Sequence, residues 1–133
     1  MSSAPQPPAH PHKERVGLQR LVHALGYSLA GLQAAFRHEK AFRLEVVLAA
    51  VMLPAAFWLG QGWVETALLA GSVMAVMAAE LVNSALEAVV DRVSLERHEL
   101  SKRAKDMGSA CVLLMVIIAA GIWLAAGWAR FGP

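Results

Sequence analysis

This chain of 133 residues has little cysteine and a net charge close to zero. Its single cysteine, Cys111, excludes a disulfide within the chain. The formal charge of +2 at neutral pH is too small to indicate a nucleic-acid-binding protein. The nucleotide-binding patterns GxxxxGK[ST] and GxGxxG are both missing. Any nucleotide site in this chain must therefore be built from other elements, such as the ends of helices.

Apolar residues, in contrast, make up 57% of the sequence, and the mean hydropathy is +0.49. Three apolar runs, at about 41–59, 64–82 and 107–129, approach or exceed the roughly 20 residues that cross a hydrocarbon core of about 30 Å. Pro54 lies inside the first run and is expected to bend it. Tryptophans lie near the ends of the runs, where the membrane interface favours them: Trp58, Trp63, Trp123 and Trp128. We therefore expect an all-α membrane protein with three transmembrane helices.

The N-terminal part divides into a tail and an amphipathic helix. Residues 1–15 are rich in Pro, Ser and His, which predicts a disordered tail, and they lack the pattern of a signal peptide. Between 16 and 37, apolar residues recur at helical spacing, which predicts a helix lying along the membrane surface. A helix packed on a soluble core is the alternative, and the apolar runs that follow disfavour it. One membrane domain then covers residues 16–133.

The distribution of basic residues predicts the orientation in the membrane. Lys and Arg gather before and at the start of the first run and again between 92 and 105, whereas the turn at 60–62 has none. Cytoplasmic loops carry the excess of basic residues. The N-terminus and the connection at 92–105 are therefore expected on the cytoplasmic side.

A row of polar residues continues the helix of the second apolar run. Its members are Glu80, Asn83, Ser84, Glu87 and Asp91. At about 100° per residue they fall within an arc of about 100°. Charged side chains inside a bilayer cost about 2.5–3.5 kcal/mol each, so they face a protein interior or do chemistry. Carboxylates suit Mg²⁺ and can accept a proton from a lipid hydroxyl, which favours a phosphotransferase site.

Other charged residues near the membrane boundary extend this interpretation. Glu39 lies just before the first run, and an ordinary surface charge explains it as well as a functional role does. Solvation explains the position of Asp91 equally well. Glu45 follows and places an acid inside the boundary. Lys105, in the basic connection before the third run, is placed to hold a phosphate.

Several stretches carry a family resemblance. Residues 80–92 read ELVNSALEAVVDR, residues 98–101 read HELS, and residues 103–110 read RAKDMGSA. Upstream, residues 24–28 read ALGYS and residues 41–45 read AFRLE. From about Arg20 onward these stretches closely resemble the prokaryotic diacylglycerol kinase family, and only the Pro/His-rich tail falls outside the resemblance.

The resemblance implies a homotrimer of three-span protomers in the bacterial inner membrane, with an active site shared between protomers. It implies transfer of the ATP γ-phosphate, with Mg²⁺, to the hydroxyl of diacylglycerol, which gives phosphatidic acid at the cytoplasmic face. Glu80 corresponds to the proton acceptor, with Asn83 beside it, and Glu39 and Glu87 correspond to metal-binding residues.

The resemblance also assigns two sets of contacts. The positions of the family's nucleotide contacts are occupied here by Arg20, Tyr27, Glu39, Glu87, Glu96, His98, Lys105 and Asp106. At its lipid contacts fall Arg20, Ala24, Ser28, Ala41, Arg43, Glu45, Glu80, Ser109 and Trp123.

Two alternative functions stay open at this point. A kinase of the same family acting on a polyprenol such as undecaprenol would use similar chemistry, although the NSA and MGSA stretches look closer to the diacylglycerol enzymes. A small transporter in which Glu80 relays protons is the other alternative. A transporter has no need of the Lys105-Asp106 pair or of Glu39, which disfavours it.

Overall fold

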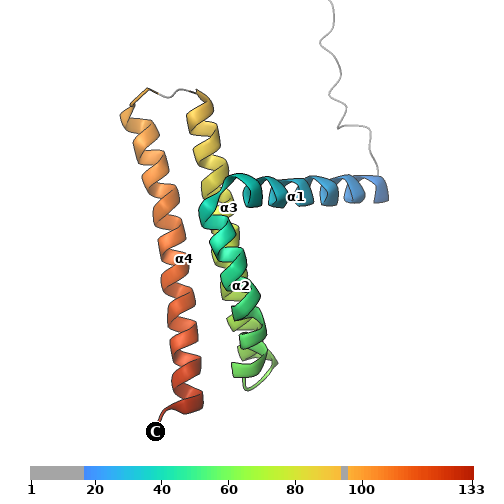
Figure 1. The fold of residues 1–133 in the computed structure, drawn as a ribbon, viewed down its shortest axis with the longest axis vertical. Helices are drawn as coiled ribbons and strands as arrows, with labels where there is room; N and C mark the ends of the chain where they lie inside the picture. Colours follow the sequence, from blue (N-terminus) through green and yellow to red (C-terminus); the bar gives the residue numbers. More distant parts are fainter. Residues whose placement is uncertain (1–16, 94–95) are drawn as a thin grey trace, which may run out of the picture. The chain divides into compact units, whose positions relative to one another are not determined.

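The computed structural model describes residues 17–93 and 96–133, and within these ranges every regular element is a helix (Figure 1). The helices are α1 (Leu18–His38), α2 (Lys40–Leu59), α3 (Trp63–Val93) and α4 (Glu99–Phe131). Three of them, α2, α3 and α4, are long and apolar enough to cross a membrane. The predicted all-α class with three spans is confirmed, whereas the predicted tail at 1–15 lies outside the described residues.

Residues up to Gln33 and residues from Ala34 onward form two separate units, and each is described by itself. In the first unit, Gly17 precedes α1 with a φ of 75°, in the left-handed region that glycine adopts at little cost. None of the described residues of α1 is buried, and the apolar side chains of Leu21, Leu25 and Leu29 are all largely exposed. An uncovered apolar row on a polar helix is typical of a membrane-surface helix.

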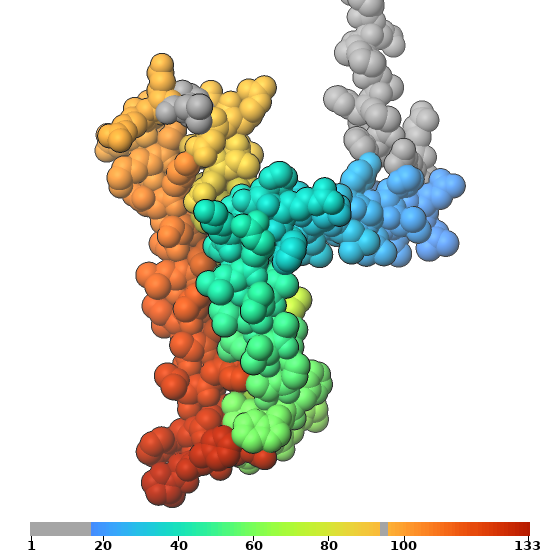
Figure 2. All heavy atoms as spheres, in the orientation of Figure 1, coloured from blue at the N-terminus to red at the C-terminus, as the bar shows by residue number. Residues whose placement is uncertain are grey.

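In the second unit, α3 packs against both other spans, whereas α2 and α4 touch only over a short stretch. That contact includes a small core of Ala56 and Leu59 from α2, Leu69 from α3 and Ala126 from α4. Figure 2 shows α4 in orange to red meeting α2 in turquoise to green towards the lower end of the view. Because the small residues Ala56 and Ala126 lie at this contact, the helix backbones approach closely there.

The helix α3 ends later, and the helix α4 begins earlier, than the corresponding apolar runs in the sequence. The helix α3 continues past residue 82 to Val93, as the polar row predicts. The helix α4 begins at Glu99 rather than near 107, because His98 caps it: the His98 Nδ1 accepts a hydrogen bond from the Leu100 N–H over 3.2 Å. Most of the basic connection is therefore helical. The helix α2 continues through Pro54 without a break.

Candidate functional site

The polar row of α3 passes from buried to exposed along the helix. Glu80 and Asn83 are only 8% and 9% exposed, Ser84 and Glu87 are half-buried, and Asp91 is exposed. Buried polar groups are normally paired inside the protein or used by a ligand. The structure therefore confirms that Glu80 and Asn83 turn inwards, and it places Asp91 where water can reach it.

Asn83 lies where α3 and α4 approach each other closely. Its Nδ2 donates a hydrogen bond to Oε1 of Glu87 over 3.4 Å, one turn further along α3. Gly108 of α4 lies opposite, so close that a Cβ at that position would collide with Asn83 Oδ1. Within the described residues no donor reaches this buried Oδ1. An unpaired buried acceptor costs about 1–3 kcal/mol, so a hydroxyl-bearing ligand is one way to satisfy it.

Four carboxylates gather around this point. Charges on Glu87 and Glu39 act on Glu80, and the charge on Glu80 acts on Glu45. Like charges gathered at low dielectric repel, and a bound cation would relieve the repulsion. Across residues 17–93 and 96–133, no group of three or more His, Cys, Asp or Glu side chains could hold a metal ion alone. Mg²⁺ needs only one or two carboxylates when phosphate oxygens complete its shell, so Glu39 and Glu87 fit such a role.

Glu39 occupies the joint between α1 and α2. It is half-buried, and its N–H donates to the carbonyl of Ala35 over 2.8 Å. The Arg43 guanidinium spans the joint from α2, because Nη1 donates to the carbonyls of Phe36 (3.3 Å) and Arg37 (2.9 Å). A cation on the last carbonyls of a helix is favourable. Arg43 therefore fixes the position of Glu39, and its expected lipid contact stays a prediction.

A cavity of about 580 Å³ lies where α3 ends and α4 begins. Its lining includes Asp91, Glu96, His98, Lys102, Lys105 and Asp106. Lys105 Nζ is 2.7 Å from Asp91 Oδ1, and Lys102 pairs with Asp106 one turn away on α4. The volume is within the range of about 300–1,000 Å³ that is usual for small-molecule sites. The structure thus brings together four of the residues expected to contact nucleotide.

Several other predicted residues lie in α1, in the first unit. Ser28 donates a hydrogen bond to the carbonyl of Ala24 over 3.0 Å within α1, and Arg20 and Tyr27 also belong to the first unit. Roles for these residues in the site stay predictions. In the second unit, Ala41 and Ser109 are exposed at their respective helices.

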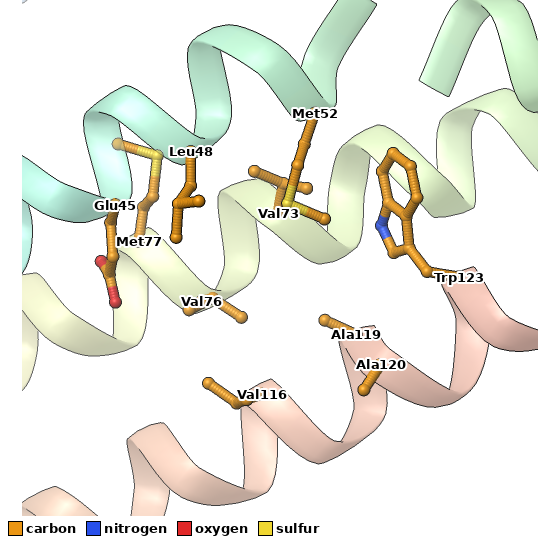
Figure 3. A pocket seen from close by; sticks show the side chains of 10 residues that line it. All are labelled: Glu45, Leu48, Met52, Val73, Val76, Met77, Val116, Ala119, Ala120 and Trp123. Atoms are coloured by element: carbon orange, nitrogen blue, oxygen red, sulfur yellow. The ribbon is translucent and has the colours of Figure 1, made fainter. Parts of the chain in front are cut away.

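A second, apolar cavity of about 230 Å³ lies between α2, α3 and α4 (Figure 3). Glu45 and Trp123 lie at opposite ends of its lining in Figure 3, and both are expected lipid contacts. Unlike Trp58, Trp63 and Trp128, which are largely exposed, Trp123 is half-buried and turned towards the protein. The Trp123 indole therefore packs on the protein, and its position relative to the membrane interface stays a prediction.

Two residues of these surroundings escaped the sequence reasoning. Gly108 belongs to a recognised motif, but the closeness of its backbone to Asn83 is a property of helix packing. Ser72 is 7% exposed and bonds Trp123. It precedes Asn83 by eleven residues, which corresponds to about 20° around the helix, so helical periodicity alone places it on the same face.

Known proteins match this chain over most of its length. The family described as prokaryotic diacylglycerol kinase matches residues 26–126. A protein of Haemophilus influenzae is 50% identical over 107 residues, which is 80% of this chain and 91% of the relative. One of Escherichia coli (strain K12) is 49% identical over 116 residues, covering 87% and 95% of the two chains. One of Pseudomonas aeruginosa is 50% identical over 113 residues, covering 85% and 92%. All three relatives bear the name diacylglycerol kinase.

Proposed function

Because the chain belongs to the prokaryotic diacylglycerol kinase family, we propose that it transfers the γ-phosphate of ATP to the hydroxyl of diacylglycerol, which forms phosphatidic acid. The observation that carries this proposal is the buried polar face of α3, where Glu80, Asn83 and Glu87 lie together opposite Gly108 of α4. The three long apolar helices make the chain a multi-pass membrane protein and bring this face within reach of a lipid.

Glu80 is the residue we assign to accept the proton of the lipid hydroxyl. Its side chain is only 8% exposed on the polar face of α3, and we place the meeting point of the lipid hydroxyl and ATP there. As the hydroxyl oxygen forms its bond to the γ-phosphorus, the bond from phosphorus to the ADP oxygen breaks and the hydroxyl proton passes to Glu80. Asn83 fixes Glu87 through Nδ2 and offers Oδ1 as an acceptor in the same face.

Glu39 and Glu87 are the residues we assign to hold Mg²⁺ together with phosphate oxygens of ATP. Their charges converge on Glu80, from the joint before α2 and from α3. When bound, the ion neutralises charge on the transferred phosphoryl group. The backbone bonds of Arg43 stabilise the joint that carries Glu39.

The cavity at the junction of α3 and α4 is the part of the chain we assign to ATP. Its four predicted contacts, Glu96, His98, Lys105 and Asp106, all line it. A site on the cytoplasmic side of the inner membrane agrees with the basic residues at 92–105. Arg20 and Tyr27 of α1 would add contacts to nucleotide, and a homotrimer would supply walls that a single three-span protomer lacks.

A lipid panel tests the proposed acceptor. Purified protein is incubated with γ-labelled ATP, Mg²⁺ and mixed micelles that contain diacylglycerol, undecaprenol or both. We expect the label in phosphatidic acid, and in the mixture we expect diacylglycerol to be preferred. Preferential labelling of undecaprenol would identify a polyprenol kinase of the same family, and label in neither lipid would contradict the kinase assignment itself.

A further inference from the structure

A hydrogen bond inside the membrane-spanning part joins α3 to α4. Trp123 Nε1 donates to Ser72 Oγ over 3.2 Å, and Ser72 Oγ in turn donates to the carbonyl of Leu69 over 2.8 Å. Ser72 is only 7% exposed. A hydrogen bond that connects two residues 51 positions apart fixes one rotamer of a large side chain, because water inside the bilayer is too scarce to replace it.

The indole held in this way forms one end of the apolar cavity between α2, α3 and α4. The cavity is lined by the aliphatic and thioether side chains of Leu48, Met52, Val73 and Met77, and Glu45 contributes its polar end (Figure 3). Within the described residues no hydrogen-bond donor reaches the buried Oε2 of Glu45. One polar end and one apolar length match a lipid whose hydroxyl-bearing head lies near Glu45 and whose chain extends towards Trp123.

The distance along α3 relates this cavity to the proposed proton acceptor. Ser72 precedes Glu80 by eight residues, which is about 12 Å along a helix axis. A lipid head that lies between Glu80 and Glu45 therefore leaves its chain about that length to run before it meets the indole of Trp123. The position of the indole would then limit how the first part of the chain packs.

From this geometry we infer that Ser72 is a positioning residue that holds Trp123 as the far wall of an acyl-chain cavity and thereby sets the preference for chain length. The inference rests on the proposed function, since it names a determinant of lipid specificity in the same site. Ser72 itself touches neither the phosphate nor the hydroxyl. Its removal should therefore change the KM for long-chain lipid, while kcat and the KM for ATP stay close to those of the original protein.

The test compares Ser72→Ala with the original protein on dibutyrylglycerol, dioctanoylglycerol and dioleoylglycerol. A typical hydrogen bond is equivalent to about a 2- to 12-fold change in an equilibrium constant. We expect the KM for the two longer lipids to rise by that factor and the KM for dibutyrylglycerol to stay within about twofold. Ser72→Thr keeps the hydroxyl and should restore the original pattern.

A second variant keeps the test decisive if Ser72→Ala fails to fold. Trp123→Phe keeps an aromatic ring but removes the N–H donor, so it should reproduce the chain-length effect, and the double variant should add nothing further. Trp63→Phe is the matched control, since Trp63 is 83% exposed and does not line the cavity. It should leave all three KM values unchanged.

Three outcomes would overturn the inference: an equal change for short and long chains, a fall in kcat alone, or additive effects of Ser72→Ala and Trp123→Phe. Failure of the proposed function is distinct from these. In that case the original protein would phosphorylate none of the three diacylglycerols. If it phosphorylates them and Ser72→Ala leaves the chain preference unchanged, only the role of Ser72 is wrong.

Discussion

Asn83 and Glu87 are bonded along α3, with the amide Nδ2 of Asn83 donating to the carboxylate Oε1 of Glu87 over 3.4 Å. This bond orients the amide, so that Oδ1 turns towards the backbone of Gly108 on α4. The residue assigned beside the proton acceptor and a residue assigned to Mg²⁺ are therefore coupled. A disturbance of either one should be felt by the other.

Gly108→Ala should disturb this pair without removing any polar group. The added Cβ would collide with Asn83 Oδ1, so either the amide rotates away from Glu87 or the two helices separate. Overpacking of this kind costs about 1–3 kcal/mol. We expect a lower melting temperature in detergent and a large loss of turnover.

The matched control is Gly121→Ala on the same helix, where an added Cβ meets nothing within 4 Å among the described residues. Replacement of a helical glycine by alanine is stabilising by about 0.5–1 kcal/mol where there is space. Gly121→Ala should therefore keep its activity, and its melting temperature should stay the same or rise slightly. Equal behaviour of the two variants would show that close packing at Asn83 is unimportant.

The metal assignment predicts a change in Mg²⁺ dependence for Glu87→Ala. Loss of one carboxylate from a shell that uses only one or two should raise the Mg²⁺ concentration for half-maximal activity, or abolish activity. Titration of Mg²⁺ at saturating ATP measures this. Glu65→Gln, at the opposite end of α3, is the control and should titrate like the original protein. An unaltered Mg²⁺ curve for Glu87→Ala would argue against ligation.

Variants of Lys105 and Asp91, which form an ion pair, distinguish a phosphate contact from a role that is limited to pairing with the lysine. Their side chains are 37% and 50% exposed, and an exposed ion pair contributes about 0.2–1 kcal/mol. Asp91→Asn should therefore change the KM for ATP by less than about fivefold, and the effect should shrink at high salt. Lys105→Met removes the phosphate contact and should raise that KM about tenfold or more.

Initial rates across an ATP series at low and high salt distinguish these cases. If Asp91→Asn is as damaging as Lys105→Met, Asp91 has a direct part in the chemistry. That result would contradict a role for Asp91 that is limited to holding the lysine.

Part of this fold and site was predictable from the sequence. Helical periodicity placed Glu80, Asn83 and Glu87 on one face, and the apolar runs gave three spans, which the structure confirms. Local patterns carry this information because it depends on neighbours within a few turns. The roles of individual carboxylates came from the resemblance, since periodicity cannot distinguish a base from a metal ligand.

Features that depend on packing between helices were not predictable. The bond between Ser72 and Trp123 joins residues 51 positions apart, and the closeness of Gly108 to Asn83 depends on how α3 meets α4. The start of α4 was also missed, because a His98 cap outweighs the polar composition of the first turns. The half-buried position of the Trp123 indole was not predictable for the same reason, because it depends on a hydrogen bond across to α3.

The role of Glu80 is tested most directly by phosphoryl transfer in Glu80→Gln. Glutamine keeps the size of the side chain but cannot accept the proton of the lipid hydroxyl, and general-base catalysis contributes about 10²–10⁴-fold. With dioleoylglycerol, Mg²⁺ and γ-labelled ATP, we predict a fall of at least about 100-fold in the rate of phosphatidic acid formation. ATP binding, measured by equilibrium dialysis on the same sample, should be largely retained. Near-normal turnover in Glu80→Gln would contradict the assignment of this buried face as the phosphotransfer site.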